Sequence, residues 1–313
     1  QHPQPRARRA TGQRAVTVVV GYLAGKSGTA PLNLAVGAAR TLGTSLTVTT
    51  VVPRPWTTPS PARVDAEYAA WADQLAADSA REAGRYLDSL PLDSHRGRLE
   101  VRYHSHAHRS VSGGLVEVVG ELDAEVLVLG SSANGQLGQV VVGATADRLL
   151  HSSPVAVAIA PRGYREPRGG VLTRITCGYP GTPGSVEAVK RTYALAGLLG
   201  VELRIITFAV RGRTMYPPEV GLHAEDSILA AWEEQATTML AELRTDGVVG
   251  DDVELAVVSG NGWDQALDDA EWQDGEILAL GTSPRSDIAR VFLGSRGAKI
   301  MRYSPVPVLV LPG

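Results

Sequence analysis

Cysteine is nearly absent from the sequence, because Cys177 is the only cysteine among 313 residues. A single thiol excludes an internal disulfide and a metal site built from cysteines. Aromatic residues make up only 5% of the chain, so aliphatic side chains must build its core. Apolar runs of roughly 18 residues, which a membrane-spanning helix needs, are also missing. This absence argues against insertion into a membrane.

Charge of one sign does not dominate either. The chain has 30 Lys and Arg residues against 33 Asp and Glu residues, which gives a net charge of −3. This balance offers no overall basic surface for nucleic acid. The sequence also shows no charged stretch followed by an apolar segment of the kind found in secretory signals. We therefore expect a cytoplasmic protein that binds no nucleic acid.

The chain instead contains an internal repeat, which is an early feature to look for in any sequence. Three segments of the first half return in the second half: VTVVVGY at 16–22 as TRITCGY at 173–179, EVLVLG at 125–130 as EILALG at 276–281, and SPVAVAI at 153–159 as SPVPVLV at 304–310. The offsets between the paired segments are 157, 151 and 151 residues. The chain therefore consists of two copies of one domain.

The repeat also indicates where the domains begin and end. The first copy spans 15–162 and the second spans 171–313. Residues 163–170 are rich in Pro, Gly and Arg and suit a linker. Residues 1–14 are basic and aperiodic, so we expect a disordered tail there.

Each copy shows the same alternation of short apolar runs and longer helical patterns. The runs predict strands at 16–20, 46–52, 99–104, 125–129 and 155–159, and again at 173–177, 202–208, 253–258, 276–280 and 306–310. The helical patterns lie at 31–42, 62–90, 110–121 and 143–151, and again at 185–199, 223–245, 263–271 and 294–302. Strands that alternate with helices predict an α/β fold with a parallel sheet covered by helices on both faces.

Ligands of such sheets bind at the carboxyl ends of the strands, so the loops there matter most. After the fourth strand, 13 positions separate Gly130 from Gly143 in the first copy and Gly281 from Gly294 in the second. A glycine before a helix lets the backbone approach a ligand closely, and the free amides of the helix start suit a phosphate. The alternative is a turn that needs glycine for its backbone angles alone.

The two loops and the final Ser-Pro-Val strand resemble the universal stress protein family over about residues 15–160 and 171–312. The resemblance implies two tandem Rossmann-like domains, each with a five-stranded, parallel, doubly wound sheet of order 3-2-1-4-5. It implies that nucleotide, where bound, lies between the ends of strands one and four. It also implies that the two copies pair through their fifth strands as an intramolecular pseudo-dimer.

The ATP-binding branch of that family carries Gly-x2-Gly-x9-Gly-Ser/Thr after strand four and an Asp in the loop after strand one. The chain departs from both patterns. Ala133 and Pro284 replace the second glycine, Ala144 replaces the Ser/Thr of the first copy, and Leu23 and Pro180 replace the Asp. The resemblance therefore implies weak or lost binding of ATP, with no cofactor required.

The candidate binding residues all lie in these loops. They are Leu23, Gly130, Ser132, Gly143 and Thr145 in the first copy and Pro180, Gly281, Ser283, Gly294, Ser295 and Arg296 in the second. The second copy keeps a hydroxyl at Ser295 and a positive charge at Arg296 beside its helix start. We therefore expect the second copy to bind nucleotide better than the first.

One loop imitates a P-loop. Gly21, Gly25, Lys26 and Ser27 follow a strand and precede a helix, but three residues separate the glycines where the motif needs four. We therefore expect no P-loop nucleotide hydrolysis, although Lys26 could still face a phosphate.

Three alternating histidines, His104, His106 and His108, would share one face of an extended segment, as a metal site requires. No acid or cysteine accompanies them at ligand spacing, so the preferred interpretation is polar loop residues and no metal. Trp71 and Trp232 fall in the two long helices, and we expect both in the core.

Taken together, these patterns predict a non-enzymatic stress-response or regulatory protein without catalytic residues. Asp147 and Asp287 are the carboxylates of the two loop regions, and neither occurs in both copies. One alternative is a nucleotide-hydrolysing enzyme, and another is an interaction module for a transporter or signalling system. The sequence is also compatible with a homodimer or another protein partner.

Overall fold

The structure is a computed structural model that describes residues 17–54, 62–90, 99–182, 184–210, 222–284, 291–292 and 295–312. The first half contains β1 (Thr17–Gly21), α1 (Ala30–Leu42), β2 (Ser45–Pro53), α2 (Ala62–Ser89), β3 (Val101–His108), α3 (Val111–Glu121), β4 (Ala124–Gly130), α4 (Ala144–Ser152) and β5 (Ala156–Ala160). The expected tail at residues 1–14 lies outside the described residues.

The second half repeats this order. It contains β6 (Arg174–Gly178), α5 (Ser185–Leu199), β7 (Glu202–Val210), α6 (Leu222–Thr245), β8 (Glu254–Gly260), α7 (Trp263–Asp268), β9 (Glu276–Gly281), β10 (Ser283–Pro284), β11 (Val291–Phe292), α8 (Ser295–Tyr303) and β12 (Val308–Leu311). The antiparallel pair β10 and β11 lies in the loop after β9 and was not predicted.

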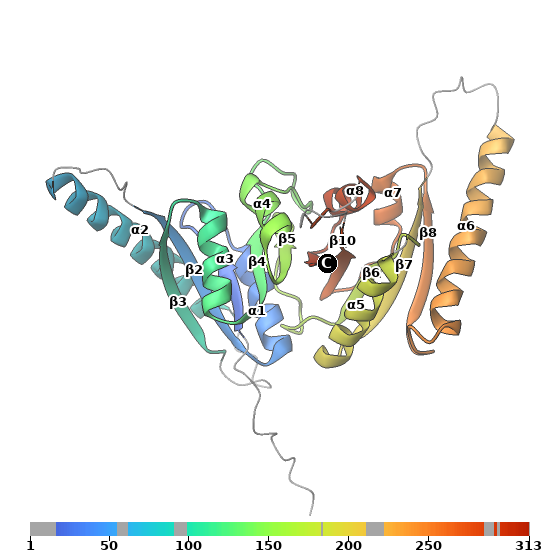
Figure 1. Ribbon diagram of the computed structural model, residues 1–313, viewed down its shortest axis with the longest axis horizontal. Helices are drawn as coiled ribbons and strands as arrows, with labels where there is room; N and C mark the ends of the chain where they lie inside the picture. The colour runs from blue at the N-terminus through green and yellow to red at the C-terminus, as the bar shows by residue number, and fades with distance from the viewer. Residues whose placement is uncertain are drawn as a thin grey trace, which may run out of the picture.

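One ten-stranded sheet runs through both halves, with the order β3-β2-β1-β4-β5-β12-β9-β6-β7-β8 (Figure 1). Within each half the strands are parallel and have the order 3-2-1-4-5, which confirms the predicted fold class. The halves meet where β5 pairs with β12 antiparallel, with Ile159 opposite Val308 and Ala158 opposite Leu309. Two edge strands that would otherwise expose unpaired backbone groups therefore cover each other.

The central strands are mostly apolar because both of their faces are buried. In β1, Val18 and Val20 belong to one hydrophobic cluster and Val19 belongs to the other. The first cluster lies under α1, α2, α5 and α6, and the second lies under α3, α4, α7 and α8. Each cluster contains residues of both halves, so the two hydrophobic layers continue across the seam.

The segment between the halves packs against α1. Asn33 of α1 donates from Nδ2 to the carbonyl oxygen of Tyr164 at 2.9 Å, and Tyr86 donates to Asn33 Oδ1 at 2.7 Å. Arg40 pairs with Glu166. Burial raises the pKa of Tyr164 well above its usual value. The linker is thus anchored to the first half by hydrogen bonds and an ion pair.

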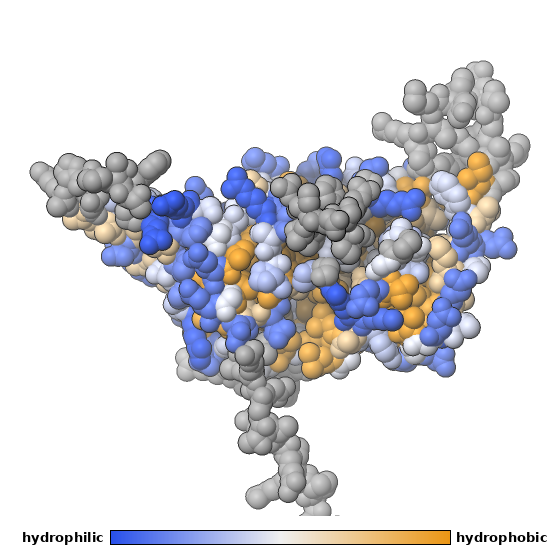
Figure 2. All heavy atoms as spheres, in the orientation of Figure 1, coloured by the Kyte–Doolittle hydropathy of each residue, from blue (hydrophilic) through white to orange (hydrophobic). Residues whose placement is uncertain are grey.

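The long helices α2 and α6 lie at opposite ends of the molecule (Figure 1). The prediction that Trp71 and Trp232 belong to the core is wrong, since they are 50% and 47% exposed. Each end helix has only one covered face, which carries Ala83 on α2 and Ala236 and Leu240 on α6. Apolar side chains also reach the surface over α5 (Figure 2).

Strand β3 ends four residues later than predicted, because β2 pairs with it along the whole length up to Pro53 and His108. The three histidines therefore lie in a strand and share the face toward α3. The interpretation of these histidines as loop residues is therefore wrong. No acid lies at ligand spacing in the sequence, but packing brings two acids close. The next helix brings Glu117 to His106, with 2.7 Å between the carboxylate and Nε2, and Glu121 close to His104 and His106.

Cys177 is free, as expected of a single cysteine, and it is buried. Burial raises the pKa of its thiol to about 11, so it packs as a small apolar residue. In the part of the chain that the structure describes, no helix is both long and apolar enough to span a membrane.

A buried charge cluster lies at the start of β9. Glu276 is buried and accepts hydrogen bonds from Arg174 Nη2 at 2.7 Å, from Arg204 Nη2 at 2.9 Å and from Thr176 Oγ1. Arg204 also lies over the ring of Trp272, 5.2 Å from its centroid. The matching carboxylate of the first half, Glu125, is exposed. This cluster therefore belongs to the second half alone.

Candidate functional site

The best-formed candidate site lies where β1 and β4 end. These strands are parallel neighbours, so the loops after Gly21 and Gly130 meet at one edge of the sheet. They enclose a cavity of about 330 Å³. Leu23, Gly130, Ser132, Gly143 and Thr145 all line it. The structure thus brings together all five residues that the sequence predicted for the first copy.

The loop after β1 is held in place by helix α2. Tyr22 donates to Glu82 Oε1 at 2.6 Å, and the Gly25 amide donates to the same oxygen at 3.2 Å. These hydrogen bonds lower the pKa of Glu82, the one from Tyr22 most. The Ala24 amide donates to Ser79 Oγ at 3.1 Å. The fixed loop places Lys26 in the cavity wall.

The loop after β4 folds back on itself before α4 begins. Ser131 Oγ accepts a hydrogen bond from the Val141 amide at 2.6 Å, and the Ser132 amide donates to the Val141 carbonyl at 2.7 Å. Gly143 then serves as the N-cap of α4 without a side-chain cap. The first amides of a helix have no partner within the helix. At α4 these amides belong to Ala144 and its successors, which line the cavity.

The floor of the cavity contains a polar group that the sequence reasoning missed. Thr49 of β2 is fully buried, lines the cavity, and its Oγ1 has no hydrogen-bond partner among the described residues. A buried hydroxyl without a partner costs free energy, which a ligand group can recover. The available signal was a threonine that breaks the apolar pattern near the end of the second strand.

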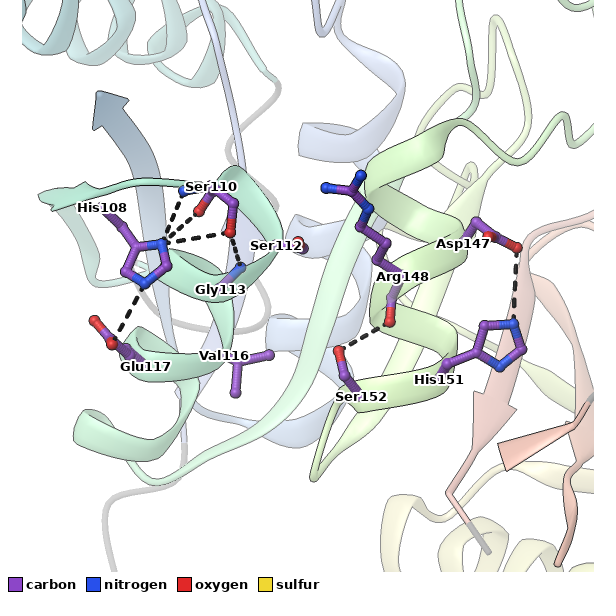
Figure 3. Close-up of a pocket in the computed structure, with 10 residues that line it drawn as sticks. All are labelled: His108, Ser110, Ser112, Gly113, Val116, Glu117, Asp147, Arg148, His151 and Ser152. Atoms are coloured by element: carbon purple, nitrogen blue, oxygen red, sulfur yellow. Dashed lines mark hydrogen bonds and ion pairs between the residues drawn. The ribbon is translucent and has the colours of Figure 1, made fainter. Parts of the chain in front are cut away.

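A larger groove of about 810 Å³ lies between α3 and α4 (Figure 3). Its two histidines are already paired with carboxylates of the same groove. His108 Nε2 lies 3.5 Å from Glu117, and His151 Nε2 lies 3.8 Å from Asp147. The smaller cavity, which contains an unpartnered hydroxyl and a helix start, is the stronger candidate for binding.

The residues of both halves match the model of the Universal stress protein family, at 16–161 and 172–312. The chain belongs to the universal stress protein family. A universal stress protein of Mycobacterium tuberculosis is 64% identical over 298 residues, which cover 95% of this chain and 100% of the relative. The values for a universal stress protein of Mycobacterium bovis are the same.

A solved universal stress protein from Archaeoglobus fulgidus aligns with a TM-score of 0.58 at 15% identity, covering 96% of this chain and 99% of that chain. At this identity the comparison supports the fold alone. It agrees with two tandem universal stress protein domains in one chain.

The second domain of this universal stress protein differs at the equivalent place. By the offset of 157, Ile206 stands where the first domain has Thr49, and Phe208 stands where it has Val51. At the helix start, Trp263 stands where the first domain has Val111. The rings of Phe208 and Trp263 are in contact, with 6.3 Å between their centroids. Larger apolar groups therefore occupy the positions that border the cavity of the first domain.

The predicted residues of the second universal stress protein domain are only partly described. Pro180 and Arg296 are exposed, and Gly281 ends β9 beside β6. The backbones of Ser283 and Ser295 lie in β10 and at the start of α8. Gly294 lies outside the described residues. The preference for the second copy therefore stays a prediction that the structure does not test.

Proposed function

We propose that the first domain binds an adenine nucleotide weakly, in the cavity between the ends of β1 and β4. We further propose that the chain acts as a non-enzymatic stress-response or regulatory protein. The observation that carries the proposal is the convergence of two loops, more than 100 residues apart, on one cavity with an uncapped helix start. The family's association with stress supports the wider role.

The phosphate end of the proposed ligand lies at Gly143. The start of α4 presents free amides and the positive end of the helix dipole, which together favour an anion. Lys26 lies in the wall of the same cavity and adds a positive charge. These features support phosphate binding without the Ser/Thr that Ala144 replaces.

The nucleoside end lies over Thr49. Its hydroxyl can donate one hydrogen bond to a polar ligand atom and can accept another from the ligand. Val51, Leu115 and Leu129 line the cavity beside it and suit the flat face of a base. The volume of about 330 Å³ is at the lower end of the range for small-molecule sites, so we expect part of the nucleotide to extend beyond the cavity.

We assign the site to the first domain, against the preference that the sequence suggested. Ile206 offers no hydroxyl, and the contacting rings of Phe208 and Trp263 stand where the smaller Val51 and Val111 line the cavity of the first domain. Larger side chains at these positions leave less room for a ligand in the second domain. The presence of Ser295 does not offset that difference.

The described residues that line the cavity include no Asp, Glu or His. Phosphate hydrolysis needs a group that orients or activates water and ligands for magnesium. Asp147 lies on α4 beside His151 and outside this lining. We therefore propose binding without turnover.

The same proposal includes the division of the chain at residues 163–170, which the two separate family matches support. It also includes a cytoplasmic location and action through a protein partner or a second copy of the chain. Nucleic acid is not among the proposed partners, because the net charge is −3.

Replacing Gly143 with Asp tests the function without damaging the fold. Gly143 has φ −82° and ψ 169°, which any residue adopts, and Asp is a favoured N-cap. A carboxylate there repels phosphate, and at about 4 Å the repulsion is worth about 1–4 kcal/mol. We expect ATP affinity to fall at least fivefold in Gly143→Asp, measured by titration of the purified chain.

Gly143→Asn is the matched control, because it adds the same volume without the charge and should bind ATP better than Gly143→Asp. Gly294→Asp makes the equivalent change in the second domain and should leave affinity unchanged. Loss of binding in Gly294→Asp alone would move the site to the second domain. Phosphate release in the same samples would favour the hydrolysing alternative.

Thr49→Val should change stability and binding in opposite directions. Valine has nearly the same shape, so the variant removes a buried hydroxyl that lacks a partner, and the free energy of unfolding should not fall. ATP affinity should fall about fivefold, since a ligand hydrogen bond contributes about 1 kcal/mol. Thermal unfolding with and without ATP measures both effects. Equal ATP affinity in the variant would show that the hydroxyl does not face the ligand.

A further inference from the structure

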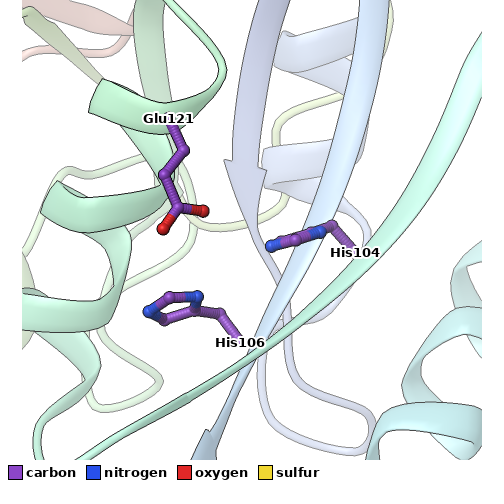
Figure 4. A group of neighbouring side chains, drawn as sticks. All are labelled: His104, His106 and Glu121. Atoms are coloured by element: carbon purple, nitrogen blue, oxygen red, sulfur yellow. The ribbon is translucent and has the colours of Figure 1, made fainter.

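We propose that His104, His106 and Glu121 form a binding site for a divalent transition metal of the zinc class. The two histidines alternate along β3 and therefore point to the same side of the strand, toward α3. Glu121 is the last residue of α3. One ligand atom from each residue lies within 4.8 Å of the others. Figure 4 shows the three side chains directed toward a common point.

The strongest evidence is an unpaired nitrogen. Nε2 of His104 is buried and has no hydrogen-bond partner among the described residues. A buried ring nitrogen in that state costs free energy, and a metal ion satisfies it directly. The rings of His104 and His106 are stacked, with 6.1 Å between their centroids. His104 is thus already oriented toward its partners before any ion is bound.

His106 is oriented by a second carboxylate. Its Nε2 lies 2.7 Å from Glu117 Oε2, and because an ionised carboxylate only accepts, Nε2 must carry the proton. Nδ1 of His106 therefore keeps its lone pair for a metal. A carboxylate that holds the far nitrogen of a metal-bound histidine is a recurrent feature of zinc sites. We assign Glu117 as a positioning residue and His106 as a ligand.

The ligand set favours a transition metal. Two imidazoles and one carboxylate suit Zn²⁺ and its neighbours Co²⁺ and Ni²⁺, whereas Ca²⁺ and Mg²⁺ prefer oxygen ligands. Zinc binds nitrogen at about 2.0–2.1 Å, so tetrahedral ligand atoms lie about 3.3 Å apart. Glu121 is exposed and at a helix end, and its side chain can supply the small closing movement. Three protein ligands leave one position for water.

The second domain offers an internal comparison. Register along β7 and β8 places Ala256 and Val258 where β2 and β3 place His104 and His106. Apolar side chains cannot bind a metal, so the proposal predicts one ion per chain. The site is independent of the nucleotide proposal, because none of its three ligands lines the cavity between β1 and β4.

Titration of the tag-free, chelator-treated full chain with Co²⁺ tests the proposal, because tetrahedral Co²⁺ absorbs visible light strongly and Zn²⁺ displaces it. We expect one equivalent to bind, with affinity at least tenfold lower in His104→Ala and in Glu121→Gln. Glu117→Gln should weaken binding about 10–100-fold. Glu121 is exposed, so its variant keeps the test valid should His104→Ala fail to fold.

His151→Ala is the control, since His151 lies on α4 and outside the proposed ligand set. It should leave the Co²⁺ affinity and spectrum unchanged. Absence of Co²⁺ and Zn²⁺ binding in the wild-type chain would overturn the proposal. One-equivalent binding that is unaffected in both His104→Ala and Glu121→Gln would also overturn it, by placing the ion elsewhere.

Discussion

Replacing Glu276 with alanine is expected to lower the free energy of unfolding of the second domain by about 3–5 kcal/mol. The substitution would leave Arg174 and Arg204 buried beside each other without the carboxylate that pairs with both. Burial already lowers the pKa of Arg204, which shows the cost of its desolvation. Breaking a buried ion pair by removing one partner is strongly destabilising, because a buried charge is left without its partner. Arg174 would keep only Glu254, 3.2 Å away and half-exposed. Denaturant unfolding measures the change.

Glu125→Ala provides the matched control, because Glu125 stands at the equivalent position of the first domain and is exposed. Substitutions at such surface positions usually change stability by less than about 0.5 kcal/mol. Equal effects of the two substitutions would show that the charge cluster does not contribute to the stability of the second domain.

Val308→Asp is expected to open the seam between the domains and to cost more than about 4 kcal/mol. Val308 is fully buried and lies opposite Ile159 in the antiparallel pair of β5 and β12. A carboxylate there lies without a partner in the apolar layer that α4 and α8 cover, and it reaches water only if that layer opens at the seam. The amides of β5 that point toward β12 should lose protection from hydrogen exchange, whereas the amides of β1 should keep theirs.

Leu137→Asp is the control for this change, because Leu137 is 76% exposed and the same substitution there buries no charge. Its unfolding midpoint should match that of the wild-type chain. If β5 keeps its protection in Val308→Asp, the pairing with β12 is not what covers the edge of the first domain.

The repeat and the strands were predictable because their signal is local. Short Val-rich runs that end in glycine, such as β1 and β4, are buried on both faces and have similar sequences in both copies. The loops of the first site were predictable for the same reason. The spacing of Gly130 and Gly143 marks where the fourth strand ends and the next helix begins.

Side-chain contacts between elements distant in the sequence were not predictable. Glu276 of β9 and Glu125 of β4 occupy equivalent positions in their strands. Beside the exposed Glu125, the pairing of β1 with β4 shifts in register between Thr17 and Val18. In the second domain, Arg174 of β6 is in register with Glu276 of β9, and Glu276 is buried. Likewise, the acids beside His106 come from the helix after β3. Their spacing from the histidines in the sequence does not match a metal-ligand motif, so the packing of the helix could not be predicted from it.

A crystal of the full chain soaked in millimolar ATP tests the central claim most directly. The account predicts phosphate density at the start of α4 beside Gly143, with the nucleoside directed toward Thr49, and no density at the start of α8. Density at α8 with an empty first domain would contradict the assignment of the site. A cavity that stays empty in both domains would contradict nucleotide binding itself.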